Sequence, residues 1–573
     1  MKKLKPPFLN MKRALLCFIC IFSFSFCDAQ KWNWAKAEVN DSGTGGFDLL
    51  SFAADNSGNS FETGAFTGTI NFGTIYLKTP PSTSNAFLVK FDHSGNAVWG
   101  MAPTIDYGAD GWAVASNNSG NVCLAGTYLG DSMKIGTYTF PFSLKTSLFV
   151  AMLNSSGILK WGAYSKNLDS KSGIAPTSAA IDKAGNTFVT GYFIDSISIG
   201  SIKIYGANDC FYIAKFDKNG NVIWVKTAKS NKSITSNTVG STVVTDTVGN
   251  AYVAGQFLDS ITIGSSTVTT LGNDVFLVKF DSSGNVKWLT SPKVSSPGGT
   301  TLYGMHGGQF LNIDNAGSLY LTGMFADTAH FGAYTLSAKY YGIFIAKYSP
   351  SGNVLWAKEN SPFNSMLSSS YQPFSISCDK YGSFYLCGTF KDTITFNSIK
   401  LTSDSTLPSF IFKFDTSGNA VCGTEINNNN DDWNYVAADP LGDDVFFSGD
   451  NFVNGCYFGS YLITGSMGEY GFLADWTCNS SEGIHEEIKK SNEINIFPNP
   501  SNGTFTLQTM GSQNFASESI EIYNVLGEKV YSGIVHSSSF IVNLSGQPNG
   551  IYLYRVLNED GGLIGEGKLI ISK

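Results

Sequence analysis

The chain has 573 residues, of which 14% are charged and 14% aromatic, and it contains 61 glycines. Ordinary soluble domains carry roughly 25% charged residues, so this composition favours short strands and tight turns over helical bundles. The formal net charge of -8 argues against a nucleic-acid partner, and with Arg13 and Arg555 as the only arginines a guanidinium clamp on phosphate is nearly excluded.

Residues 1–29 come first and have the pattern of a secretory signal peptide. Basic residues precede an apolar run from Ala14 to Phe26, and Cys27-Asp28-Ala29 follows as a small-x-small cleavage site. The run is shorter than the roughly 20 apolar residues of a membrane-spanning helix. We expect cleavage after Ala29 and no transmembrane segment. Lipidation of Cys27 is the alternative, although the preceding Phe-Ser-Phe lacks the small residues of a lipobox.

A turn-and-strand pattern then recurs seven times, about every 64 residues. The turn reads D/N-x-x-G-N or a near variant, and the strand after it ends in Gly-x-aromatic, followed later by a Phe-Gly or Ile-Gly pair. The seven turns begin at Asp55, Asn117, Asp182, Asp246, Asp314, Asp379 and Asp439. A second G-N turn and a strand carrying tryptophan close the complete repeats, with Cys422 in place of the tryptophan in the sixth.

Each repeat predicts four strands with alternating side chains, expected in the second repeat at 112–116, 121–128, 147–153 and 158–163. Four-stranded units repeated radially form a β-propeller. The seventh repeat lacks its fourth strand, but residues 31–38 place Trp34 where the tryptophan of that strand belongs. The sequence therefore predicts an all-β fold with a seven-bladed β-propeller of four-stranded blades over residues 30–478, in which residues 31–38 close the last blade.

The repeats resemble the seven-bladed propeller repeats of exported bacterial proteins, which alternate D-x-x-G-N turns with G-N-x-x-W strands. The resemblance covers about residues 31–478 and implies an architecture without an activity. We expect the tryptophans of the closing strands to pack between blades rather than to dock a quinone cofactor. They are Trp34, Trp99, Trp161, Trp224, Trp288 and Trp356.

A polar linker at 479–493 leads to a second domain, residues 494–573, in which alternating strands predict a small β-sandwich. Its blocks IFPNPSNGTFTL, IEIYNVLGEKVYS, VNLSGQPNGIYLYRV and GKLIISK resemble the C-terminal sorting domain of the type IX secretion system of Bacteroidetes-type bacteria. The resemblance implies that residues 494–573 engage the secretion machinery, that the protein crosses the outer membrane, and that it is then released or attached to the cell surface.

Seven cysteines remain after the signal, an odd number that cannot all pair within one chain. We expect Cys123 and Cys210, which lie in apolar strand patterns, to be buried thiols. A bridge between Cys456 and Cys478 is one candidate pairing. No CxxC pair is present, so a zinc ribbon is excluded.

Catalytic and metal-binding patterns are absent from the sequence. The D-x-x-G-N turns lack the alternating ligands and final Glu of a calcium loop, and Asp capping its own turn explains them. The five histidines show no ligand spacing, and no G-x-S-x-G, H-E-x-x-H or P-loop occurs. We therefore expect no cofactor and no metal.

Three aspartates share the seventh position before the repeat turn, namely Asp48, Asp110 and Asp432. In a closed ring the first, second and seventh blades are neighbours, so these carboxylates would meet at one mouth of the propeller and could hold a cation, an amine or a glycan. Independent solvated side chains are the alternative. Nearby aromatic and polar residues, on loops of the kind where binding residues concentrate, are Phe47, Trp112, Trp433, Tyr303 and His306.

Two classes of function follow from this pattern. The first is a secreted or surface-displayed, non-catalytic scaffold that recognises glycan or protein. The second is an extracellular enzyme that acts on a polysaccharide or other polymer with carboxylates at the propeller mouth. The absence of a nucleophile–base pair in the sequence favours the scaffold.

Overall fold

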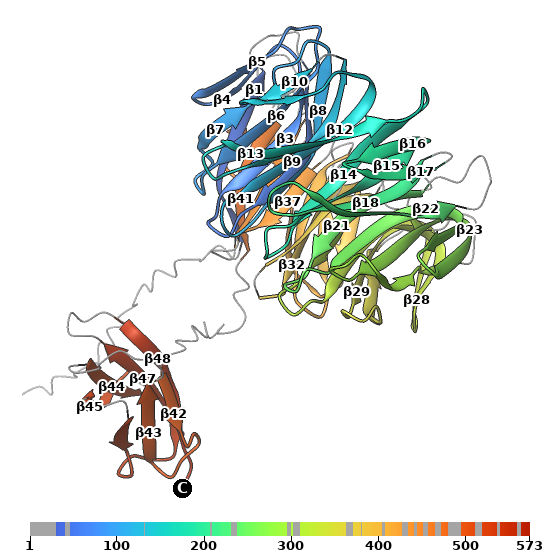
Figure 1. The fold of residues 1–573 in the computed structure, drawn as a ribbon. Coiled ribbons are helices and arrows are strands. Elements are labelled where there is room, and N and C mark those ends of the chain that lie inside the picture. Colours follow the sequence, from blue (N-terminus) through green and yellow to red (C-terminus); the bar gives the residue numbers. More distant parts are fainter. Residues whose placement is uncertain are drawn as a thin grey trace, which may run out of the picture. The chain divides into compact units, whose positions relative to one another are not determined.

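The computed structural model describes the greater part of the chain as strands and turns. The described residues are 30–40, 46–130, 132–206, 209–230, 238–294, 300–301, 310–361, 371–379, 381–403, 407–426, 434–439, 444–450, 456–463, 471–478, 494–509, 518–525, 527–535, 539–557 and 563–573. The expected signal peptide, the linker and the loop residues Tyr303, His306, Asp432 and Trp433 lie outside them. Every regular element of the described residues is a strand (Figure 1), so the all-β fold class is confirmed.

The chain divides into two bodies, one ending at Ser481 and one beginning at Glu482. In the first body the repeated sequence forms sheets in which four strands, here called a to d, pair in chain order. Sheet 2 shows the pattern with β8 (Gly108–Ser116), β9 (Val122–Gly130), β12 (Ser143–Leu153) and β13 (Leu159–Asn167).

Five further sheets have the same a-to-d order. Sheet 1 contains β2 (Phe47–Ala54), β3 (Ser60–Phe66), β6 (Asn85–Phe91) and β7 (Ala97–Met101). Sheet 3 contains β14 (Gly173–Ile181), β15 (Thr187–Ile194), β18 (Cys210–Phe216) and β19 (Val222–Thr227). Sheet 4 contains β21 (Thr238–Thr245), β22 (Ala251–Ile263), β23 (Ser266–Phe280) and β24 (Val286–Thr290). Sheet 5 contains β27 (Leu311–Ile313), β28 (Leu319–Phe331), β29 (Tyr334–Tyr348) and β30 (Val354–Glu359). Sheet 6 contains β31 (Tyr371–Cys378), β32 (Phe384–Phe390), β35 (Ser409–Phe414) and β36 (Ala420–Ile426).

Sheet 7 takes its last strand from the beginning of the chain. Its strands are β37 (Asn434–Ala438), β38 (Asp444–Gly449), β41 (Gly471–Cys478) and β1 (Gln30–Asn40). Strand β1 pairs antiparallel with β41 from Gln30 opposite Cys478 to Glu38 opposite Gly471. Figure 1 shows blue β1 beside orange β41, two strands from opposite ends of the repeat region.

Short hairpins between strands b and c add to the four strands that the sequence predicts. One is β4 (Thr69–Phe72) with β5 (Ile75–Lys78), and another is β16 (Ser196–Ile199) with β17 (Ile202–Tyr205). They turn at the Phe-Gly and Ile-Gly pairs of the repeats, where glycine adopts positive φ. β4 pairs with β1 of sheet 7 and β16 with β13 of sheet 2, so these two hairpins join sheets 1 and 3 to the preceding sheets.

The cores of the first body lie between neighbouring sheets. Each buried cluster combines residues of two consecutive sheets, as in the cluster that joins Val150 of sheet 2 to Val189 of sheet 3. The series includes a cluster between sheet 7 and sheet 1, in which Phe446 and Leu473 pack with Phe47 and Phe87. Each of sheets 1 to 7 therefore shares a buried cluster with the sheet before it and with the sheet after it, sheet 7 being followed by sheet 1.

The repeat turns follow the expected chemistry. Asp55 Oδ1 accepts hydrogen bonds from the amides of Ser57 (2.8 Å) and Asn59 (3.0 Å), and Gly58 has φ +73°. In the closing strands a tryptophan lies over the turn glycine of the next sheet. Trp161 Nε1 donates to Lys218 O (3.1 Å), beside Gly220.

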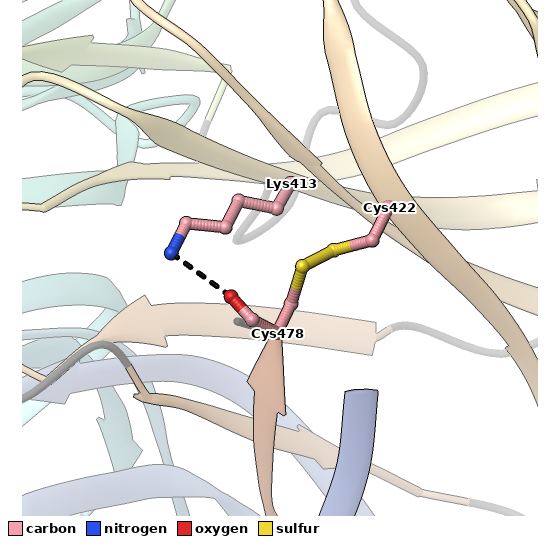
Figure 2. The surroundings of a disulfide bond; sticks show 3 residues. All are labelled: Lys413, Cys422 and Cys478. Carbon is pink, nitrogen blue, oxygen red and sulfur yellow. Dashed lines mark hydrogen bonds between the residues drawn. A yellow bond between two sulfur atoms is a disulfide. The ribbon is translucent and has the colours of Figure 1, made fainter. Parts of the chain in front are cut away.

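A disulfide bond links sheets 6 and 7 (Figure 2). Cys422 in β36, which replaces the tryptophan of the repeat, bonds to Cys478 at the end of β41. The candidate pairing of Cys456 with Cys478 is therefore wrong, because Cys456 is a buried free thiol. Cys123 and Cys210 are buried thiols outside any disulfide, as expected. The bond replaces the tryptophan contact that joins other neighbouring sheets.

The second body consists of two sheets that share one core. The first contains β42 (Ile494–Phe497), β43 (Thr504–Thr509) and β46 (Ser539–Asn543). The second contains β45 (Lys529–Val535), β44 (Glu518–Asn524), β47 (Gly550–Leu557) and β48 (Leu563–Ile571). Phe505 and Val542 of the first sheet pack with Ile520 and Tyr552 of the second.

Candidate functional site

The a strands of all seven sheets line one central cavity of about 320 Å³. Its walls consist mainly of small side chains, such as Ala53, Ala115, Ala179 and Ala437. No Asp, Glu, His, Lys or Arg lies among its lining residues. Cys378 contributes a thiol to the lining, and Asp48 and Asp110 are not among the lining residues.

Asp48 and Asp110 occupy equivalent positions in neighbouring a strands. β2 has a β-bulge between Leu49 and Ser51, and β8 has the same bulge between Gly111 and Ala113, so each aspartate lies two residues before the bulged residue. A Cβ at Gly64 would collide with the carbonyl of Asp48, and a Cβ at Gly126 with that of Asp110. The glycine of each Gly-x-aromatic motif thus marks the same place in both sheets.

Asp110 lies in a partly dry environment. Its carboxylate is half-buried, and Oδ1 accepts a hydrogen bond from Ser84 Oγ (3.0 Å). Burial raises the pKa of Asp110, and the Ser84 hydrogen bond opposes that rise. Asp48, by contrast, is exposed.

The two aromatic residues near these aspartates differ in exposure. Phe47 is buried and stacks on Phe87 with ring centroids 5.3 Å apart, so it belongs to the core. Trp112 is only partly buried, and its Nε1 donates to Thr127 Oγ1 (2.9 Å). Of the two, Trp112 offers an aromatic surface to a ligand.

The seventh sheet departs from the register on which Asp432 was aligned. β37 has no bulge, since Asn434 pairs with Gly449 and Tyr435 with Ser448. Between the residue that pairs with the motif glycine and the repeat turn, β37 has one residue fewer than β2. A count of seven residues back from Asp439 therefore reaches one residue beyond the position equivalent to Asp48. Asp432 itself lies outside the described residues.

Sequence reasoning missed Asp450, which sheet 7 places beside the first residues of β2. The side chain is 3% exposed, and Asp450 Oδ2 accepts a hydrogen bond from the amide of Leu49 (2.6 Å). Asp450 directly follows the glycine of its Gly-x-aromatic motif. The residues at the same position in sheets 1 and 2, Ala65 and Thr127, are uncharged. A charged residue at this aligned position in sheet 7 was therefore the sequence signal that could have pointed to Asp450.

Comparisons with known proteins concern the C-terminal body most directly. Residues 495–572 match the family described as "Secretion system C-terminal sorting domain". An "Uncharacterized WD repeat-containing protein L264" of Acanthamoeba polyphaga mimivirus is 25% identical over 248 residues, which cover 36% of this chain and 17% of that protein.

Two solved structures align with low scores. A member of the DUF4221 family from Bacteroides vulgatus has a TM-score of 0.31 at 10% identity, over 78% of this chain and 98% of that one. The extracellular domain of a putative hybrid two-component system from B. thetaiotaomicron has a TM-score of 0.15 at 11% identity, over 91% and 79%. Neither score supports an argument about fold or function.

The match of residues 495–572 indicates where the protein is located. A secretion system C-terminal sorting domain directs its chain through type IX secretion, so this protein is exported to the cell surface or outside the cell. Among the described residues, no helix has the length and hydropathy to cross a membrane.

Proposed function

We propose that sheets 1 to 7 are the blades of a seven-bladed β-propeller over residues 30–478, with 479–493 as linker and 494–573 as sorting domain. The closed circuit of cores between consecutive sheets supports this architecture. So does the contact of Trp34 in β1 with Gly95 in the turn of sheet 1, which repeats the contact of Trp161 with Gly220. WD repeats, which the name of the mimivirus protein mentions, also build propeller blades.

We further propose that this exported propeller is a non-catalytic scaffold that binds a glycan or protein ligand at the mouth formed by the starts of the a strands. The observation that carries the proposal is the equivalent placement of Asp48 and Asp110 in the a strands of neighbouring sheets, with Trp112 two residues after Asp110 at the bulge of β8. Carboxylates accept hydrogen bonds from hydroxyl or amino groups, and a partly exposed tryptophan can cover an apolar face of a sugar or side chain. Asp432, Trp433, Tyr303 and His306 belong to this proposed site by sequence position alone.

A glycan and polysaccharide array probed with the exported protein tests the proposal. We expect binding that the double substitution Asp48→Asn/Asp110→Asn weakens. The matched control is Asp106→Asn, which changes an exposed aspartate of the same surface. Equal binding by the double variant and the control would contradict the proposed site.

The second candidate function, a polymer-active extracellular enzyme, predicts a different result from the same assay. Any polysaccharide that binds would become shorter during incubation, and Asp110→Asn would stop the shortening. The raised pKa of Asp110 favours this candidate, because a raised pKa suits a general acid. Binding without shortened products would favour the scaffold.

A further inference from the structure

Three carboxylates and one histidine gather where sheet 7 meets sheet 1. His93 lies in the turn between β6 and β7, Asp444 begins β38, and Asp475 lies in β41. One ligand atom from each of these three side chains lies within 4.8 Å of the others. Asp439 Oδ2 lies 3.2 Å from His93 Nδ1, so a third carboxylate adjoins the group.

Asp475 replaces a lysine that most other sheets carry at this place. Asp475 pairs with Phe446 as Lys215 pairs with Phe188 in sheet 3. The equivalent lysines extend over the paired aromatic ring, at 4.6–5.6 Å from the ring centroid. They are Lys90, Lys215, Lys279, Lys347 and Lys413.

These lysines normally join one sheet to the next. Lys215 Nζ donates to Ser282 O (3.0 Å), and Lys279 Nζ donates to Pro350 O (3.2 Å), each acceptor being the second residue of the next sheet's turn. His93 is the second residue of the corresponding turn in sheet 1. Between sheets 7 and 1, the carboxylate of Asp475 therefore takes the place of the ammonium group, and the turn residue whose backbone carbonyl accepts in the other sheets is a histidine.

Asp444 is a second replacement of a donor by a carboxylate. The amide of Asp439 donates to Asp444 O (2.9 Å), as that of Asp55 donates to Asn59 O (2.8 Å). In sheet 1 the Asn59 side chain also donates to the carboxylate of Asp55, with Nδ2 2.8 Å from Oδ2. An ionised Asp444 has no hydrogen to donate and cannot make that bond. The replacements at Asp475 and Asp444 therefore both add negative charge at the same place.

The buried carboxylate of Asp475 indicates that a ligand is needed. The residue is 2% exposed, and among the described residues no donor reaches Asp475 Oδ1, while Oδ2 accepts from Asn33 Nδ2 (3.0 Å). A buried carboxylate beside others is costly unless a cation lies between them.

We propose that His93, Asp444 and Asp475 bind one Zn²⁺ ion that fastens sheet 7 to sheet 1. An imidazole nitrogen with carboxylate oxygens suits Zn²⁺, whereas Ca²⁺ takes six to eight oxygen ligands. Thr477 Oγ1 donates to Asp444, and Asn33 Nδ2 donates to Asp475 and to Thr477, so a second layer of hydrogen bonds orients both carboxylates. The half-exposed His93 leaves a path from solvent.

The ion would supply the positive charge that lysine supplies between other sheets, at the place where β1 completes sheet 7. Asn33 belongs to β1, so the site forms fully only when the first strand has paired with β41. Binding to the folded protein alone raises its stability. The proposed role is therefore structural, and it does not depend on the ligand-binding function.

The test uses the exported full chain after treatment with a chelator, with calorimetry and thermal unfolding in Zn²⁺, Ca²⁺ or Mg²⁺. We expect one Zn²⁺ per chain and a higher Tm with Zn²⁺ only. His93→Gln and Asp475→Asn should each lower zinc affinity by at least about 100-fold, since loss of an outer-layer partner alone costs 10–100-fold. The control His330→Gln changes a histidine that contacts Thr335 in sheet 5 and should leave zinc binding unchanged.

A charge-reversing variant separates zinc binding from folding. Asp475→Lys restores the residue of five other sheets and should unfold at or above the Tm of the zinc-free protein, with no response to Zn²⁺. Equal Tm increases in Ca²⁺ and Zn²⁺ would overturn the assignment of the ion. Unaltered zinc binding in the His93 and Asp475 variants, or no binding by the parent chain, would overturn the site.

Discussion

In five of the repeats, the glycine of the Gly-x-aromatic motif meets a steric demand of the strand beside it. Gly191 in β15 faces the carbonyl of Ala175 where β14 bulges, and a Cβ there would collide with that backbone oxygen. Backbone cannot move aside as a flexible side chain can. We expect Gly191→Ala to lower the free energy of unfolding by about 1–3 kcal/mol, measured by urea denaturation.

Gly173, in the same pair of strands, is the matched control for this prediction. A Cβ at Gly173 meets nothing within 4 Å, so Gly173→Ala should change the free energy of unfolding by less than about 0.5 kcal/mol. Equal losses of unfolding free energy in the two variants would contradict this explanation. They would mean that Gly191 is needed for backbone flexibility rather than for the close approach of two strands.

Asp110 makes stability depend on pH in a defined direction. Burial raises its pKa in the folded state, so the folded protein binds more protons than the unfolded chain above the usual Asp value of about 3.9. Stability therefore falls as pH rises from that value through the folded pKa. Asp110→Asn removes this loss and keeps an acceptor for Ser84, so its advantage over the parent should grow with pH.

Thermal unfolding of the parent and of Asp110→Asn, from pH 3 to pH 8, measures this difference. Asp106→Asn, at an exposed position between β7 and β8, is the control for the loss of one carboxylate. A difference between Asp110→Asn and the parent that does not change with pH would contradict the prediction.

Single residues also show where sequence alignment stops being reliable. The equivalence of Asp48 and Asp110 could be predicted because both strands keep the same distance to the repeat turn. Asp432 was aligned by the same count, but β37 lacks the bulge and so lacks one residue. The site at His93, Asp444 and Asp475 joins residues from both ends of the repeat region, so no local spacing reveals it. The replacement of a lysine by Asp475 and that of the turn asparagine by Asp444 were the signals visible in the sequence.

At the scale of elements, strand periodicity identified a to d in most repeats but missed the hairpins between b and c. Strands such as β4 and β5 have four residues each, too few for an alternation to stand out. The long-range pairing of β1 with β41 was predictable for another reason. The seventh repeat lacked one strand, and Trp34 marked a segment with the right sequence at the other end of the chain.

Strand β1 provides the element-scale prediction. Trp32 is 8% exposed and packs on Phe458 and Trp476, with ring centroids 4.8 and 6.3 Å away. Trp32→Ala should lower the free energy of unfolding by about 3–5 kcal/mol, and deletion of residues 31–38 should cause aggregation by exposing the edge of β41. Tyr76→Ala, at a 56% exposed residue, is the control. A deletion variant that stays monomeric and equally stable would show that β1 does not close the circuit.

At the scale of the whole molecule, two bodies with separate cores carry separate tasks. The repeat body packs its seven cores between sheets, while the second body has its own core around Phe505 and Ile520. Their cores share no residue, so we expect each body to fold without the other. Export information can therefore reside entirely in the second body, where the sorting-domain match lies.

This division predicts the outcome of a truncation. A chain that ends at Ser481 keeps residues 1–29, where the sequence predicts a signal peptide, and all seven sheets, so it should reach the periplasm of a type IX-competent host in folded form and accumulate there. Fractionation followed by immunoblotting of periplasm, cell surface and medium measures its location. In the converse experiment, residues 482–573 fused behind a periplasmic protein should carry that protein to the surface or the medium. Normal export of the truncated chain would place the sorting signal in the repeat body, because the deleted segment would then be dispensable.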